Sequence, residues 1–235
     1  MRGAYAAGLV LVVTDRTQVP RGRTLLCVVG AALEGGARAV LVRERDLPAE
    51  ERTALVDAVV RLAARHAALA LVASPLPGRP GPPPHEPPAR RDPTHGHLDP
   101  SGVHLRRDEP LPATLDRTRT LVGSSCHDLA ELRRACDERL DHVTLSPVAA
   151  SRSKPGYGPT LGATGLRELV RAARAERVEV PAILALGGVD ETNAGSWIEA
   201  GADGVAVMGA VMRAPDPAAT TRSIVHGVAA ARGAA

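Results

Sequence analysis

Residues 180–212 read VPAILALGGVDETNAGSWIEAGADGVAVMGAVM, and this stretch decides the fold. It holds two short apolar runs, PAILAL and GVAVM, which are typical of strands buried on both faces, and the segment between them has helical spacing. Glycine follows both runs, and its missing Cβ lets backbone amides approach a ligand closely. The N–H groups at the start of a helix also favour a bound anion. We therefore expect a phosphate site at Gly187, Gly188, Met208 and Gly209.

Six more strand-like runs precede this stretch, and most of them alternate with helical patterns. The predicted strands span residues 9–14, 39–42, 67–73, 102–105, 121–123, 142–145, 181–186 and 204–208. The predicted helices span residues 25–36, 48–66, 128–136, 164–176, 190–202 and 217–231. This alternation predicts a single (β/α)8 TIM-barrel domain over residues 1–235. The loops after the seventh and eighth strands of such barrels commonly bind phosphate, which agrees with the positions of the glycines.

A proline-rich segment at residues 74–100 takes the place of the third helix. It contains ten of the chain's 20 prolines, together with His85, His95 and His97. We expect a loop inserted within the barrel domain, since proline interrupts helices and the segment has little apolar surface to bury. The His-x-His pair has no nearby cysteine to complete a ligand set, so a solvated loop is favoured over a metal site.

The composition indicates a globular chain that acts on small molecules. Of the 235 residues, 44% are hydrophobic but only 1% are aromatic, so base stacking on a single-stranded nucleic acid is not expected. The net charge of +3 is spread along the chain, which suits a phosphorylated small molecule at least as well as a polyanion. No apolar run is long enough to span a bilayer, so no membrane partner is expected. The three cysteines lack paired spacing and no signal peptide opens the chain, which favours a reducing cytoplasm.

Charged residues directly follow the second predicted strand. Arg43, Glu44, Arg45 and Asp46 fall at the carboxyl end of that strand, which is the catalytic face of a barrel. Arg43 and Arg45 are therefore candidate substrate-binding residues. A solvated loop with local ion pairs is the alternative.

Two further loops carry candidate functional side chains. His127 lies between the fifth strand and the next helix, where the helix N-terminus favours a neutral imidazole that can act as a general base. An N-cap or surface role is the alternative for this histidine. The loop after the sixth strand contains Ser151, Ser153 and Lys154, three candidate substrate-binding residues. Lys154 is the chain's only lysine, which indicates a need for a compact ammonium there, with chance survival as the alternative.

Seven short motifs occur in order along the chain. They are LVVTD, LVRER, GVHL, GSSCH, SRSKPG, ALGGV and GADGVAVM, and they cover about residues 9–218. The ordered set resembles the thiamine phosphate synthase/TenI family. This resemblance implies a (β/α)8 barrel that handles a thiazole phosphate in thiamine biosynthesis.

One branch of the family that the chain resembles comprises thiamine phosphate synthases, which join a pyrimidine diphosphate to a thiazole phosphate with the help of Mg²⁺. Their pattern has Gln, Arg and Lys after the second strand, an Asn-Asp pair after the third and an Asp after the fourth. Here Val42 stands at the Gln position, Arg45 at the Lys position and Ser74-Pro75 at the Asn-Asp position. Asp108 alone remains of the metal-binding carboxylates, and one carboxylate is a poor site for Mg²⁺.

The other branch, TenI, includes thiazole tautomerases, which need a base and one phosphate anchor but no metal. The sequence Arg43-Glu44-Arg45 and the histidine of GSSCH resemble this branch, whose catalytic histidine maps to His127. We therefore expect a thiazole tautomerase without a metal cofactor, and Mg²⁺-dependent thiamine phosphate synthase is the alternative. A non-catalytic, ligand-binding or regulatory paralogue is a third hypothesis. The sequence is compatible with a homo-oligomer but does not indicate one.

Overall fold

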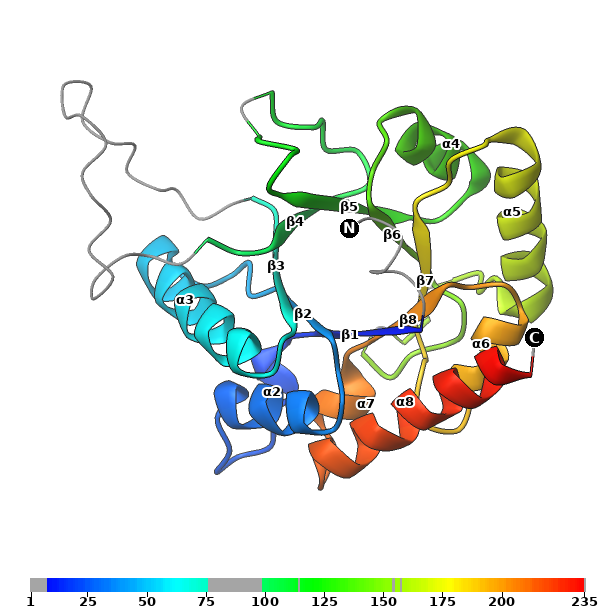
Figure 1. Ribbon diagram of the computed structural model, residues 1–235. Coiled ribbons are helices and arrows are strands. Elements are labelled where there is room, and N and C mark those ends of the chain that lie inside the picture. Colours follow the sequence, from blue (N-terminus) through cyan, green and yellow to red (C-terminus); the bar gives the residue numbers. More distant parts are fainter. Residues whose placement is uncertain (1–7, 76–98, 114, 154, 157, 235) are drawn as a thin grey trace, which may run out of the picture.

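The computed structural model describes residues 8–75, 99–113, 115–153, 155–156 and 158–234 (Figure 1). Its strands form a closed barrel in which each strand pairs in parallel with the next, and β1 (Leu9–Val13) pairs with β8 (Gly204–Val207). Helices surround the ring of strands (Figure 1). The predicted (β/α)8 TIM barrel is therefore confirmed.

Most elements begin and end within two residues of their predicted bounds. The other strands are β2 (Ala39–Val42), β3 (Leu69–Ala73), β4 (Gly102–Leu105), β5 (Leu121–Cys126), β6 (His142–Leu145) and β7 (Ala182–Leu186). The helices are the short 3-10 helix η1 (Arg16–Gln18), α2 (Leu25–Glu34), α3 (Ala49–Arg65), α4 (Leu129–Asp137), α5 (Gly162–Glu176), α6 (Ala194–Glu199), α7 (Gly209–Met212) and α8 (Pro217–Gly233).

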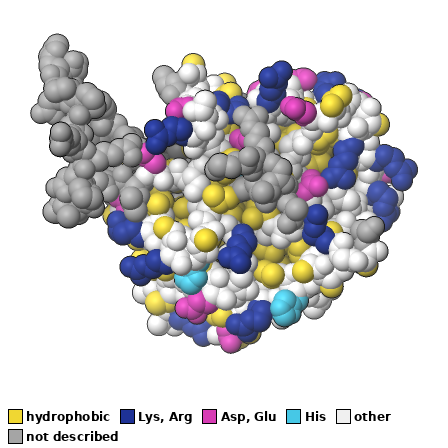
Figure 2. Space-filling model, in the orientation of Figure 1, with side chains coloured by type: hydrophobic (Ala, Val, Ile, Leu, Met, Phe, Trp, Pro, Cys, Tyr) yellow, Lys and Arg dark blue, Asp and Glu magenta, His cyan; other side chains and the backbone are white. Residues whose placement is uncertain are grey.

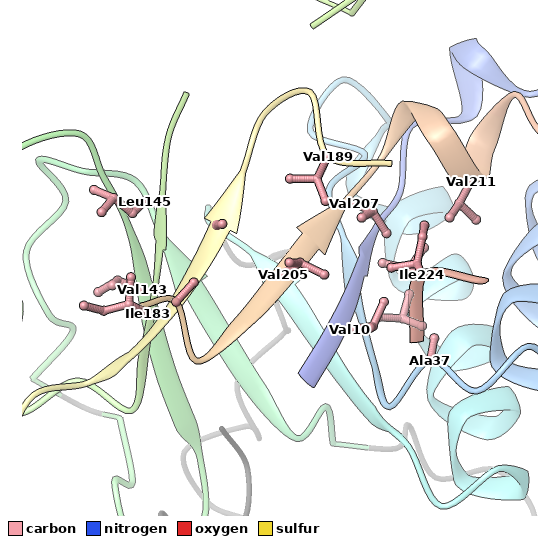
Figure 3. Packing of buried hydrophobic residues seen from close by; sticks show 14 of the residues in the cluster. Val10, Ala37, Val143, Leu145, Ile183, Val189, Val205, Val207, Val211 and Ile224 are labelled. Carbon is pink, nitrogen blue, oxygen red and sulfur yellow. The ribbon is translucent and has the colours of Figure 1, made fainter. Parts of the chain in front are cut away.

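Side-chain alternation along the strands divides the core into two regions. One side of each strand faces the helices, as Val10 and Val207 do where they point toward Ile224 and Val211 (Figure 3). The other side fills the barrel interior with a second cluster: Leu9, Leu11, Val13, Ala39, Leu41, Leu71, Ala73, Leu184 and Ala206. Small aliphatic side chains fill both regions, which is how a chain almost without aromatics builds this core.

Side-chain caps fix the starts of three α-helices. The side chains of Thr24, Asp128 and Asp216 each accept a hydrogen bond from a backbone N–H of the first turn, at the starts of α2, α4 and α8. Each cap satisfies an N–H group that has no partner within the helix. The predicted N-cap at Asp128 is therefore present.

Two elements differ clearly from their predicted bounds. β5 continues to Cys126 instead of ending at Gly123, because Ser124 and Ser125 stay paired with β6. α6 is shorter than the predicted helix at residues 190–202. Its first residues form a turn in which the Asp190 N–H donates to the Asn193 side chain and the Thr192 N–H donates to Asp190. Local bonds of this kind compete with the helical ladder.

The predicted proline-rich loop falls mostly on residues 76–98, which lie outside the described part of the chain, so its form stays a prediction. The described residues between β4 and β5 form turns and no helix.

In the part of the chain that the structure covers, no helix combines the length and apolar character that crossing a membrane requires. Figure 2 shows Lys and Arg side chains scattered over the visible face, without a single basic block.

Candidate functional site

A pocket of about 450 Å³ opens where the loops after β6, β7 and β8 meet the end of β1. It lies at the carboxyl ends of the strands, where barrel active sites are found. Seven of the predicted site residues line it: Arg43, Ser151, Ser153, Gly187, Gly188, Met208 and Gly209. The fold thus brings together residues from four different loops.

The glycines after β7 allow two loops to pack backbone against backbone. Gly187 and Gly188 have φ values of 103° and 64°, in the left-handed region that favours glycine. A Cβ on Gly188 would lie 2.5 Å from the carbonyl oxygen of Ala150, in the loop after β6. A Cβ on Gly187 would lie 3.1 Å from the Cα of Pro147. Both positions therefore need glycine for a structural reason, and both residues line the pocket.

Arg213 places a positive charge over the start of α7, and it was not among the predicted site residues. A Cβ on Gly209 would lie 2.4 Å from Nη1 of Arg213, so the guanidinium covers the first turn of this helix. Nη1 also donates to the side-chain oxygen of Gln18 and, at 3.3 Å, to Ser153 Oγ. Ser153 Oγ in turn donates to the same oxygen of Gln18 at 3.0 Å. These bonds hold one cation among the loops after β1, β6 and β8, beside the glycine amides.

The charged residues after β2 separate into an ion-paired group and a pocket-facing residue. Glu44 is buried, with 1% of its surface exposed, and accepts from the backbone N–H and from Nη1 of Arg16, both at 3.0 Å. Arg16 also donates to Asp46 at 2.8 and 2.7 Å, and this hydrogen bonding lowers the pKa of Asp46. Arg43 lines the pocket instead. Local ion pairs and a pocket-facing side chain, which were alternatives for this segment, therefore occur together, and the role of Arg43 in substrate binding stays a prediction.

Arg45 belongs to a second cationic region at the mouth, around the ends of β2, β3 and β4. Its Nε donates to the carbonyl oxygen of Ser74 at 2.8 Å, and it does not line the 450 Å³ pocket. Burial lowers the pKa of Arg45 to about 10, and the nearby charges of Arg43, Arg106 and Arg52 act in the same direction. Guanidinium groups that disfavour one another's charge are stabilised by a bound anion.

The acidic residues after β4 do not form a metal site with their described neighbours. Asp108 is exposed and lies 2.7 Å from Arg107 and 3.8 Å from Arg134. Glu109 instead accepts from Ser74 Oγ and, at 3.1 Å, from the Arg106 N–H. Within the described ranges no three His, Cys, Asp or Glu side chains gather as metal ligands. These donors do not fit Mg²⁺, which favours carboxylate oxygens in octahedral geometry.

His127 lies next to the pocket without lining it. Its Nδ1 is 2.6 Å from the carbonyl oxygen of Ser146, a residue that does line the pocket, and its backbone N–H donates to Glu131 at 2.6 Å. The ring therefore anchors the loop after β6 in this conformation. Lys154, which was predicted to bind substrate from the loop after β6, lies outside the described residues, so its role stays a prediction.

Comparison with known proteins connects this site to a family. The family model described as thiamine monophosphate synthase matches residues 93–211. The chain is 35% identical to the thiamine-phosphate synthase of Roseiflexus castenholzii over 92% of its own length and 86% of the relative's. It is 32% identical to the thiamine-phosphate synthase of Chloroflexus aurantiacus, with coverages of 91% and 89%. The solved structure of thiamine phosphate pyrophosphorylase from Pyrococcus furiosus superposes with a TM-score of 0.72 at 26% identity, covering 95% of this chain and 96% of that one.

These relatives do not support the predicted thiazole tautomerase and favour the alternative, a synthase. The family likeness itself extends over nearly the whole chain, and the ordered motifs, the closed barrel and the matched sequences agree. The chain belongs to the thiamine monophosphate synthase family.

Proposed function

We propose that this chain is a thiamine-phosphate synthase, which joins a pyrimidine diphosphate to a thiazole phosphate. The observation that carries the proposal is the pair of cationic regions on one barrel mouth. The first region consists of Arg213 and the glycine amides after β7 and β8, and the second consists of Arg45 and Arg106. Arg43 lines the pocket of the first region and also acts electrostatically on Arg45, so it lies between the two. One substrate with a phosphate and another with a diphosphate would use both regions, whereas a tautomerase needs one phosphate anchor.

The proposed reaction needs charge stabilisation at the leaving group. The thiazole ring nitrogen donates an electron pair to the pyrimidine-bearing carbon, a carbon–nitrogen bond forms, and the carbon–oxygen bond to diphosphate breaks. Negative charge grows on the departing diphosphate, and fixed guanidinium groups near it would lower the barrier. No proton has to be removed by the protein in this step. The position of His127 outside the pocket lining agrees with a reaction that has no general base.

The described carboxylates do not supply a Mg²⁺ site, so the proposal assigns no step to a metal ion. The arginines of the second region would supply the countercharge that carboxylate-bound Mg²⁺ supplies in synthases with the full motif. Any dependence on Mg²⁺ is a separate question for the assay.

The proposal is tested by incubating the purified protein with the pyrimidine diphosphate and the thiazole phosphate, with and without Mg²⁺. Thiamine phosphate and diphosphate should appear in equal amounts. A test variant is Arg45→Met, which removes a charge of the second region and should lower the rate more than it lowers thiazole phosphate binding. Tight binding of both ligands without any product would instead favour a non-catalytic paralogue. Conversion of a thiazole phosphate tautomer in the absence of the pyrimidine would favour the tautomerase.

A further inference from the structure

The barrel interior is apolar on most strands but polar on the side formed by β4, β5 and β6. The inward side chains of β1, β2, β3 and β7 are aliphatic, whereas β4, β5 and β6 present His104, Ser125, His142 and Thr144. Burying polar groups in a barrel core is unfavourable unless they bond to one another. Because the rest of this core is apolar, the polar group requires its own explanation.

The two histidines bond to each other across a glycine. Nδ1 of His104 lies 3.1 Å from Nε2 of His142, and their ring centroids are 5.3 Å apart. The strand register aligns His104 with Gly123 and Gly123 with His142. A Cβ on Gly123 would lie 2.1 Å from His142 Nε2, so the imidazole occupies the space of the missing side chain. The glycine on β5 therefore makes this contact between β4 and β6 possible.

The hydrogen-bond chain continues from the histidines to the barrel mouth. Nε2 of His104 lies 3.2 Å from Ser125 Oγ and 3.4 Å from Thr144 Oγ1. Both histidines are buried, but Ser125 is partly exposed near the carboxyl end of β5. Ser125 thus connects the buried pair to the face on which ligands bind.

The direction of the hydrogen bond between the two histidines decides whether His104 Nε2 donates or accepts toward Ser125 and Thr144. Burial lowers the pKa of both imidazoles, for His142 to about 4, so both rings are neutral at neutral pH and each carries one N–H. If His142 donates to His104 Nδ1, then His104 Nε2 carries a proton and donates to Ser125, whose O–H is left to donate to a ligand. If His104 Nδ1 donates instead, His104 Nε2 becomes an acceptor for Ser125 at 3.2 Å or Thr144 at 3.4 Å, and a Ser125 hydroxyl that donates to it can only accept from a ligand.

We infer that His142 is a positioning residue that acts through His104 and selects a single orientation of the Ser125 hydroxyl at the mouth. This inference rests on the proposed function for its kinetic consequence. The proposed phosphate site, or glycine cradle, is formed by Gly187, Gly188 and Gly209 after β7 and β8, and Ser125 does not line that pocket. The hydroxyl is therefore expected to contact the pyrimidine diphosphate rather than the thiazole phosphate.

The first test uses nitrogen NMR of the unmutated protein. A scalar coupling between His104 Nδ1 and His142 Nε2 would show the hydrogen bond directly, and well-separated ¹⁵N shifts for His104 would show one fixed neutral tautomer. Absence of the coupling together with averaged His104 shifts would overturn the inference. This measurement needs neither a variant nor catalytic turnover.

The second test compares H142F, which keeps a ring but removes both nitrogens, with H142Q, whose amide can occupy the place of Nε2. H226F is the matched control, because His226 is exposed on α8. The ¹⁵N shifts of His104 should become averaged in H142F and return to separated values in H142Q. KM for the pyrimidine diphosphate should rise about threefold to tenfold in H142F, with KM for the thiazole phosphate unchanged.

The outcomes separate this inference from the proposed function. A fixed His104 tautomer in H142F, or an averaged tautomer with unchanged KM for the pyrimidine diphosphate, would overturn the role of His142. Failure of the unmutated protein to make thiamine phosphate would overturn the proposed synthase activity instead. In that case the ¹⁵N coupling and shifts would still decide whether His142 fixes His104.

Discussion

Gly188→Ala is expected to move the loop after β6 and to weaken catalysis more than it weakens the fold. The added Cβ would lie 2.5 Å from the Ala150 carbonyl oxygen, and real Cβ contacts are essentially never below 3.0 Å, so the backbone has to move by at least about 0.5 Å. Since a displacement of 1 Å can reduce activity about a hundredfold, this movement should lower kcat/KM for the thiazole phosphate about tenfold. The left-handed φ of 64° adds a cost of roughly 1–2 kcal/mol to folding.

Gly22→Ala is the matched control for the backbone cost. Gly22 also has a left-handed φ, of 87°, but a Cβ there would meet no atom within 4 Å, and the residue does not line the pocket. Urea denaturation should show a similar loss of unfolding free energy from the φ value in both variants, with a further loss in Gly188→Ala. Steady-state kinetics should show the fall in kcat/KM in Gly188→Ala alone. Equal kinetics in the two variants would refute the argument that this glycine shapes the ligand site.

Three further predictions concern single side chains. Arg213→Met should raise the Kd for the thiazole phosphate about tenfold or more, because the proposed charged hydrogen bond to the phosphate would be lost, and isothermal titration with the ligand measures this Kd directly. His127→Asn should change synthase turnover by less than about threefold, since an amide can still bond the Ser146 carbonyl; a loss of a hundredfold would restore the histidine as a general base. Stability should fall as pH decreases from about 6.5 toward 4, because the unfolded chain binds a proton at His142 that the folded chain, with a pKa of about 4, does not; the loss is about 3 kcal/mol. His104, whose pKa is also lowered, contributes in the same direction, and H142F should show a flatter dependence in denaturant titrations at each pH.

The glycine cradle could be predicted from the sequence because its cause is local. A glycine directly after a buried strand marks a loop where the backbone comes close to another group, and both such loops line the pocket. Arg16 and Arg213 could not be found in this way. Their partners, Glu44 and Gln18, lie 28 and 195 positions away, so only the closed barrel shows which arginine faces the site.

The continuation of β5 to Cys126 and the contact of His142 with His104 could not be predicted for a related reason. Ser124 and Ser125 look like loop residues because hydroxyl side chains are common in turns, but the interior of this barrel supplies His104 as a partner for Ser125. His142 carries no sequence signal of its own, since a histidine at the start of a strand has many uses. The proline-rich loop and Lys154 lie outside the described residues, so those predictions stay open.

The contact between Arg213 and Gln18 joins the last βα loop of the barrel to the first, across 195 positions of sequence. The arrangement of Arg213 beside the glycines is therefore complete only when β8 has closed onto β1, and under the proposed function a partly folded chain should bind phosphate more weakly. Ligand binding is then coupled to ring closure as a whole. A phosphorylated ligand at a hundred times its Kd should add about 2.7 kcal/mol to global unfolding. The bound ligand should also slow hydrogen exchange in β1 and β8 alike, although only β8 is followed by a pocket glycine, Gly209.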